Sequence, residues 1–225
     1  AQRRERCTYG RIEADTFCLC LPCNGQEIHT ALERARESLT AYNPNYNIDP
    51  RFGLYRVEDN RMPVNLMYDR ATLAAKTCKN DYRLFYAMYD EEMSSNLVME
   101  QELINKMTTA LQTGQFVIYL QPQYDLRTNQ PAGAEALVRW NYPGKELMLP
   151  KDFIPVFERN GFISRLDFYV WEQVCRLLRG WLDAGKTPLP ISVNISRVNV
   201  YNPKLADILC GLTEKYQVPP SLLNL

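Results

Sequence analysis

Histidine is almost absent from this sequence, because His29 is the only one among 225 residues. A catalytic pair of histidine bases and a multi-histidine metal centre are therefore excluded. A bound metal ion would have to be held by oxygen atoms of Asp, Glu and Asn. Such ligands select hard cations such as Mg²⁺ or Mn²⁺.

The sequence also lacks an excess of one charge and lacks long apolar runs. Lys+Arg and Asp+Glu number 26 each, so the net charge is near zero. This balance argues against a nucleic-acid-binding protein, which usually presents a basic face. The hydrophobic content is 46%, yet no apolar run approaches the roughly eighteen residues that a membrane span needs. The length suits one large domain or two small ones.

A secretory signal is missing, and the seven cysteines form an odd number. We therefore expect reduced thiols in a cytoplasmic protein. Tethering to a membrane through a region outside this sequence stays open. Cys18, Cys20 and Cys23 suggest a metal site, but a second ligand pair is missing. Since Cys18 and Cys20 can face the same side of a buried strand, we expect a structural role for them.

Hydrophobic spacing predicts an α/β chain whose two halves separate near residue 92. In the first half we expect strands at 17–21, 51–57 and 82–89 and helices at 27–42 and 64–78. A helix at 93–110 joins the halves, with an exposed Glu102–Lys106 pair. We favour a core-packing helix that opens the second domain. The alternative is a connecting helix that passes a conformational signal.

The octet at 133–140 is the most informative segment of the chain. In a strand, Glu135 and Arg139 lie on one face, while Ala136 and Trp140 lie on the other. A carboxylate and a guanidinium on an otherwise apolar strand are unfavourable to bury without a partner or a task. Either the two side chains satisfy each other across the pleat, or they form part of a functional site.

Four motifs, in order and with matching spacing, resemble the EAL family, enzymes that hydrolyse the bacterial second messenger cyclic di-GMP. The octet contains Glu135-Ala136-Leu137, the family's signature. The other motifs are the strand with Leu120-Gln121-Pro122, the stretches 149–158 and 161–167, and the segment 191–196, which is similar to the family's third strand. A lone EAL tripeptide would carry almost no information, so the prediction depends on the combination.

The resemblance implies that residues 111–225 form the first part of an EAL (β/α)₈-type barrel. It also implies hydrolysis of cyclic di-GMP to pGpG with Mg²⁺ or Mn²⁺ as cofactor. Glu135 and Asn194 match metal ligands of the family, and Gln121 and Arg139 match substrate-binding residues. The planar fork of Arg139 suits phosphate oxygens.

Each of these assignments has a structural alternative. Asn194 could be an ordinary strand-end turn residue, and Gln121 could cap a strand end before Pro122. Asp152 is predicted to be a helix N-cap ahead of Phe153. Glu158 lies in a family motif with a structural role, so we expect neither carboxylate to be a ligand.

Residues 111–225 are fewer than half of the about 250 residues that a closed barrel of this kind needs. Later metal ligands of the family, including its Glu-x-Thr-Glu motif and its Asp-Asp pair, are missing. We therefore expect a piece of a longer protein, with no complete catalytic set and no activity of its own. Its uncovered sheet edge predicts association with the missing remainder or a homodimer.

The first half resembles the C-terminal part of a GGDEF domain, the ferredoxin-like, cyclase-type fold that makes cyclic di-GMP from two GTP. The signature turn reads Glu13-Ala14-Asp15-Thr16-Phe17. Its two glycines are absent, and Thr16 occupies the position of a metal-binding carboxylate. The inhibitory-site motif reads Arg4-Glu5-Arg6-Cys7, and Asn80 replaces a usual arginine, although Lys76 matches a phosphate-contacting lysine.

The resemblances imply a degenerate GGDEF half at 1–92 without diguanylate cyclase activity, a connecting helix at 93–110, and an EAL part at 111–225. The first interpretation is a cyclic di-GMP phosphodiesterase regulated by its inactive cyclase half. The second is a non-catalytic module that binds cyclic di-GMP, or GTP at the degenerate half. The third is an interaction scaffold without either ligand. An upstream sensor region is expected outside this sequence.

Overall fold

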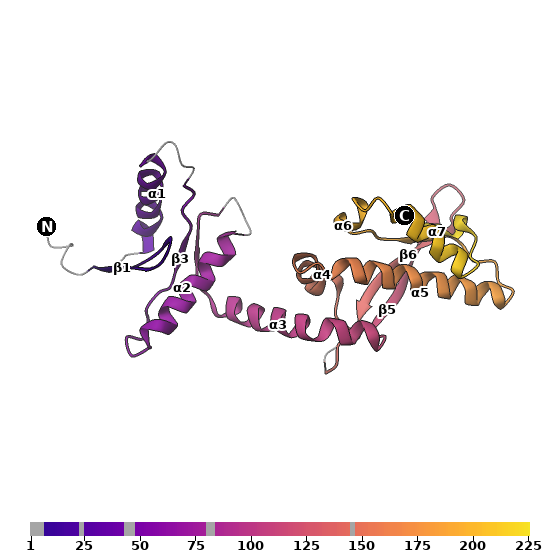
Figure 1. The fold of residues 1–225 in the computed structure, drawn as a ribbon, viewed down its shortest axis with the longest axis horizontal. Coiled ribbons are helices and arrows are strands. Elements are labelled where there is room, and N and C mark those ends of the chain that lie inside the picture. Colours follow the sequence, from indigo (N-terminus) through magenta and orange to yellow (C-terminus); the bar gives the residue numbers. More distant parts are fainter. Residues whose placement is uncertain (1–6, 23–24, 43–47, 80–83, 145–146) are drawn as a thin grey trace. The chain divides into compact units, whose positions relative to one another are not determined.

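The structure is a computed structural model that forms two compact units, residues 1–97 and 98–225 (Figure 1). It describes residues 7–22, 25–42, 48–79, 84–144 and 147–225. Within these ranges, no helix combines the length and the apolar character required to cross a membrane.

The first unit contains two small sheets and their helices. Its elements are β1 (Thr8–Glu13), β2 (Thr16–Cys20), α1 (Gly25–Ala41), β3 (Phe52–Leu54), α2 (Val64–Lys79), β4 (Tyr86–Met88) and the start of α3 (Glu91–Gln112). Strands β1 and β2 form an antiparallel hairpin, and β3 pairs in parallel with β4. At Gly53, an added Cβ would lie 1.8 Å from the carbonyl oxygen of Ala71, so glycine permits β3 to approach α2.

Three strand predictions for this unit need correction. The two strands expected at 51–57 and 82–89 have only three residues each, because the β3–β4 ladder has three pairs; residues 82 and 83 lie outside the described residues. The strand expected to be buried, β2, exposes 71% of Phe17 and 59% of Leu19. In the described part of the chain β2 pairs only with β1, and no residue on either face of β2 is buried.

Within the described ranges, five cysteines are free thiols: Cys18, Cys20, Cys78, Cys175 and Cys210. Cys20 is exposed and Cys18 is half-buried. Cys23 lies outside the described residues. Burial raises the pKa of the Cys175 thiol to about 11, which suppresses the reactive thiolate.

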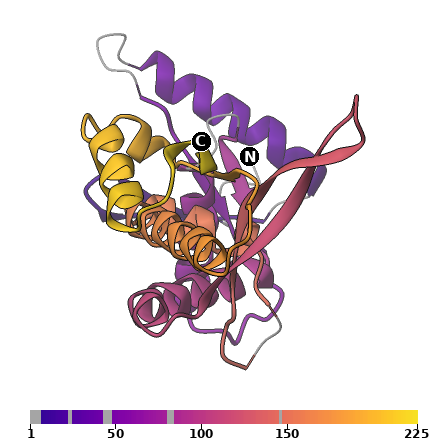
Figure 2. The same cartoon turned by 90° about the vertical axis from the view of Figure 1, so that its right-hand side faces the viewer.

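The second unit is built around one mixed sheet with the strand order β5-β6-β7-β8. Its strands are β5 (Phe116–Asp125), β6 (Gln130–Trp140), β7 (Ile191–Val193) and β8 (Leu223–Asn224). Its helices are α4 (Pro150–Arg159), α5 (Ile163–Asp183), α6 (Arg197–Val200), α7 (Leu205–Lys215) and the 3₁₀ turn η2 (Pro220–Leu222). Strand β5 is antiparallel to β6, and the remaining pairs are parallel. The long β5–β6 hairpin extends beyond the short β7 (Figure 2).

Helix α5 packs against β5, β6 and β7 and closes one face of this sheet (Figures 1 and 2). The predicted alternation of β6 is confirmed: Ala136 and Trp140 are 2% and 0% exposed, whereas Glu135 and Arg139 are only half-buried. Trp140 packs in an aromatic cluster with Phe116, Phe153 and Phe157. Apolar burial on this face leaves the opposite face of β6 available for polar side chains.

Helix α3 supplies core residues to the second unit. Leu103 and Ala110 are buried, and Ile104, Met107 and Leu111 pack against the same core. This confirms the core-packing interpretation for the C-terminal part of the helix. Glu102 and Lys106 are exposed as predicted, and both bond to the hydroxyl of Tyr142, at 3.1 and 2.8 Å.

Two local predictions in this unit are wrong. Asp152 is not the N-cap of α4: Leu149 occupies that position and Pro150 begins the helix, because its fixed φ suits the first turn. Asp152 instead lies in the first turn, where a carboxylate is favourable near the helix dipole. The strand expected at 191–196 ends at Val193, because the following backbone bonds to α5, as described below.

Candidate functional site

Polar side chains of three strands form a row on the sheet face opposite α5. Gln121 of β5 is the antiparallel partner of Glu135 in β6. Glu135 is in turn the parallel partner of Ser192 in β7. Because residues in register across a sheet project to the same side, these three side chains are neighbours.

Glu135 and Asn194, the two predicted metal ligands, are in direct contact. The Nδ2 atom of Asn194 donates a hydrogen bond to Oε1 of Glu135 at 2.9 Å, across 59 positions of sequence. Asn194 directly follows the last residue of β7, so it does occupy a strand end. Its side chain bonds to Glu135 of the neighbouring strand β6.

Arg139 lies farther along the same face of β6. Its Nη1 donates to the carbonyl oxygen of Val138 at 2.9 Å, and its guanidinium carbon lies 5.9 Å from the ring centre of Tyr119. The described contacts of Glu135 and Arg139 therefore go to other groups, not to each other across the pleat. Gln121 in the polar row and Arg139 beside the row both remain accessible, since Gln121 is exposed and Arg139 is half-buried.

Sequence reasoning missed Tyr119, which is 52% exposed on this face. It precedes Gln121 by two positions in β5, so the period-two alternation of the strand could have identified it. A tyrosine ring beside a guanidinium can restrict the arginine and offer a flat surface for stacking.

The side-chain oxygen atoms of Glu135 and Asn194 are suitable ligands for a hard divalent cation. A carboxylate oxygen and an amide carbonyl oxygen are typical ligands of Mg²⁺, which often takes one or two protein carboxylates and completes its shell with water and substrate phosphates. Within the described residues, no group of three or more His, Cys, Asp and Glu side chains could hold a metal ion. The described residues thus offer a pair of oxygen donors that matches part of a metal site.

Sequence reasoning also missed two residues of α5 that form hydrogen bonds with the backbone at and after Asn194. Trp171 of α5 donates its Nε1 hydrogen to the carbonyl oxygen of Asn194 at 3.1 Å. Asp167, one turn earlier, accepts from the backbone N–H of Ser196 at 2.8 Å. The available signal was a carboxylate among the apolar residues of the buried stripe of α5.

The predicted cyclase motif forms the turn of the β1–β2 hairpin. Glu13 ends β1 and pairs with Thr16 at the start of β2, which leaves Ala14 and Asp15 as the turn. Nε of Arg11 donates to the carbonyl oxygen of Ala14 at 2.8 Å. Lys76 is exposed on α2. The predicted positions 4–6 and 80 lie outside the described residues.

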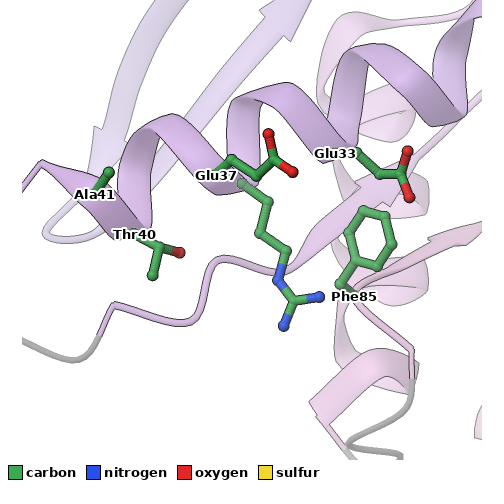
Figure 3. Close-up of a pocket in the computed structure, with 6 residues that line it drawn as sticks. Glu33, Glu37, Thr40, Ala41 and Phe85 are labelled. Atoms are coloured by element: carbon green, nitrogen blue, oxygen red, sulfur yellow. The ribbon is translucent and has the colours of Figure 1, made fainter.

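A separate depression lies beside α1 in the first unit (Figure 3). Its lining residues are Glu33, Arg36, Glu37, Thr40, Ala41 and Phe85. The guanidinium of Arg36 lies 5.1 Å from the ring centre of Phe85 and bonds to Asp49 at 3.3 Å. Most of the lining is exposed, so this depression lacks the enclosed, convergent polar groups of a typical ligand site.

Comparison with known proteins gives a family match to the second unit. The family described as EAL domain matches residues 104–225. The bifunctional diguanylate cyclase/cyclic di-GMP phosphodiesterase MucR of Pseudomonas aeruginosa is 30% identical over 155 residues, 69% of this chain and 23% of that protein. The cyclic di-GMP phosphodiesterase NbdA of the same organism is 34% identical over 134 residues, 59% of this chain and 17% of that protein.

The fold is also similar to a solved structure, the PaMucR phosphodiesterase in complex with c-di-GMP. The two share 31% identity with a TM-score of 0.51, over 54% of this chain and 49% of that chain. The chain spans less than a quarter of the length of either curated relative.

Proposed function

We propose that this chain, which belongs to the EAL domain family, takes part in metal-dependent hydrolysis of cyclic di-GMP to pGpG within a longer protein. The observation that carries the proposal is the 2.9 Å contact between Glu135 and Asn194. The phosphodiesterase names of two relatives support the same reaction. EAL domains in general depend on divalent metals.

Glu135 and Asn194 are the residues that would hold Mg²⁺ or Mn²⁺. Such an ion, when bound, activates water and neutralises charge on the phosphodiester. Arg139 would bind a phosphate through its planar fork, and the ring of Tyr119 beside it would limit its mobility. Gln121, opposite Glu135 on the neighbouring strand, would donate a hydrogen bond to the substrate from the same face.

The test is Glu135→Ala in the whole protein that contains this chain. We expect loss of cyclic di-GMP hydrolysis, measured as pGpG formation in the presence of Mn²⁺. Glu214→Ala is the matched control, because it removes an exposed glutamate of α7 in the same unit. Wild-type turnover by Glu135→Ala would contradict the assignment.

A second candidate is a receptor that binds cyclic di-GMP without cleaving it. The favouring observation is that Gln121, Tyr119 and Arg139 lie on the β5–β6 hairpin alone and need no metal to form a binding face. Tight binding of cyclic di-GMP by the whole protein, without turnover even with Mn²⁺, would select this function.

For the rest of the chain, we propose a degenerate GGDEF part at 1–92, a connecting helix at 93–110 and an EAL part at 111–225. The hairpin turn at Ala14 and Asp15 supports this assignment, because it lies where the cyclase signature is expected. GTP should yield no cyclic di-GMP with this protein. A rise in the melting temperature with GTP would indicate that the first unit binds nucleotide, and no rise would favour a structural role.

A further inference from the structure

Helix α5 carries a buried carboxylate that the proposed reaction does not use. Asp167 is 8% exposed, and a buried carboxylate is unfavourable unless hydrogen bonds replace its lost hydration. Its Oδ2 accepts two bonds of 2.8 Å, from the backbone N–H of Ser196 and from Nδ2 of Asn199. The other amide atom of Asn199, Oδ1, accepts from the hydroxyl of Ser164 at 2.8 Å.

These bonds join α5 to the segment that carries Asn194. Trp171, one helical turn after Asp167, is fully buried and donates to the carbonyl oxygen of Asn194 at 3.1 Å. Two side chains of one helix therefore fix the backbone at Asn194 and again two residues later, at Ser196. Both attachments are partly buried, so water competes less for them than at the open surface.

The attachments explain why β7 ends at Val193. The N–H of Ser196 is bonded to a side chain of α5, so it cannot extend the ladder with β6. The chain turns towards α5 instead, and the side chain of Asn194 is left directed at Glu135. A free loop at this point would give the Asn194 side chain many positions, most of them away from Glu135.

We propose that Asp167 and Trp171 are positioning residues that hold the backbone after β7 so that the side chain of Asn194 meets Glu135. Neither residue touches the polar row itself. The consequence for metal binding rests on the proposed function, whereas the consequence for the position of Asn194 does not. Hydrogen-bond partners behind metal ligands typically change metal affinity by about 10–100-fold when they are removed.

The experiment uses the 225-residue chain and reads the side-chain amide resonances of Asn194 by NMR, identified by their loss in Asn194→Ala. Glu135→Ala gives the reference position of these resonances without the 2.9 Å hydrogen bond. We expect Asp167→Ala to move them towards that reference. Asp167→Asn, which keeps an acceptor oxygen, should restore most of the wild-type position. Asp183→Ala is the control, because it removes an exposed aspartate of the same helix.

Trp171→Phe provides an independent variant if Asp167→Ala does not fold. It keeps an aromatic ring in the core but removes the indole N–H donor together with part of the ring volume, and Trp181→Phe controls for the lost volume. The same shift of the Asn194 resonances is expected, whereas Trp181→Phe, on the same helix and also packed against the core, should leave them in place. Unchanged Asn194 resonances in a folded Asp167→Ala or Trp171→Phe chain would overturn the proposal.

Mn²⁺ titration of the whole protein that contains this chain, followed by the EPR signal of the free ion, separates this inference from the proposed function. We expect Asp167→Ala to weaken Mn²⁺ binding by about tenfold or more, with recovery in Asp167→Asn. If Glu135→Ala weakens Mn²⁺ binding but Asp167→Ala does not, the positioning role is refuted and the metal site stands. Absent Mn²⁺ binding, or binding that Glu135→Ala leaves unchanged, would refute the metal site, and the NMR comparison would still decide the positioning of Asn194.

Discussion

At the residue scale, a charged cluster links α5 to the end of α7. Oε1 of Glu172 accepts hydrogen bonds from Nζ of Lys215 at 2.7 Å and from the hydroxyl of Tyr216 at 2.6 Å. These bonds, first that from Lys215, hold the pKa of Glu172 below its ordinary value. A carboxyl group with a lowered pKa in the folded state stabilises the fold above its unfolded pKa, and this stabilisation is lost as the pH falls through the folded pKa.

We therefore expect Glu172→Gln to lower the melting temperature at neutral pH, by an amount equivalent to about 0.5 kcal/mol for such a partly exposed pair. The difference from wild type should shrink as the pH falls through the lowered pKa of Glu172, where its carboxylate becomes protonated. Thermal unfolding between pH 7 and pH 3.5 measures the loss of stability at neutral pH and its decrease at lower pH. Glu214→Gln, at an exposed position of α7, is the control. A difference that is constant over this pH range would contradict the prediction.

Residue types and motif spacing predicted the central pair of the candidate site. The family resemblance indicated Glu135 and Asn194, and the structure places them in contact. Asp167 and Trp171 were not assigned a role, because their importance depends on contacts with a loop that is remote in sequence. A local pattern reports which side of a helix is buried, but it does not identify the partner of a buried polar group.

At the element scale, the two longest strands were the most predictable. Alternation over β6 and the apolar face of β5 are properties of a single segment, so the sequence carries them directly. Strands β3, β4 and β7 are much shorter than predicted, because the length of a ladder depends on its partners. Helices α1 and α2 begin and end within a few residues of their predicted limits, since each has its own periodicity.

The close packing of β3 on α2 gives a prediction for Gly53. A Cβ at this position would lie 1.8 Å from the carbonyl oxygen of Ala71 and 2.5 Å from the backbone nitrogen of Ala75. Backbone atoms cannot rotate away as a flexible side chain can, so strand and helix must separate. We expect Gly53→Ala to destabilise the first unit by about 3 kcal/mol, measured by urea unfolding.

Gly10→Ala is the matched control for this substitution. Gly10 also lies within a strand, β1, but an added Cβ there would meet no atom within 4 Å. Its unfolding midpoint should therefore stay close to that of wild type. Equal midpoints for the two variants would show that β3 can move away from α2 without loss of stability.

At the scale of the whole molecule, the second unit leaves one sheet face accessible. Tyr119 is 52% exposed, and Gln121 beside it is exposed as well. The short β8 pairs with β7 alone among the described strands, and an unpaired strand edge promotes association. We expect the 225-residue chain to self-associate at micromolar concentrations, as measured by light scattering coupled to size exclusion.

A charged substitution tests whether this face is responsible. Tyr119→Lys should shift the chain towards the monomer, because Tyr119 lies on the edge strand β5 and a lysine on an edge strand opposes pairing with another chain. Tyr201→Lys, at a residue 86% exposed after α6, should leave association unchanged. A monodisperse wild-type monomer would refute the prediction.

The contact between Glu135 and Asn194 also has a consequence for the order of folding. They are 59 positions apart, and the residues between them include α4 and α5. Asn194 is anchored to α5 through Trp171. Closing so long a loop carries a large entropic penalty unless the intervening helices have already shortened it. The hairpin of β5 and β6 can form locally and early, but the two halves of the polar site meet only after α5 has docked. We therefore expect the site to form late in folding, so that its presence would report a complete core of the second unit.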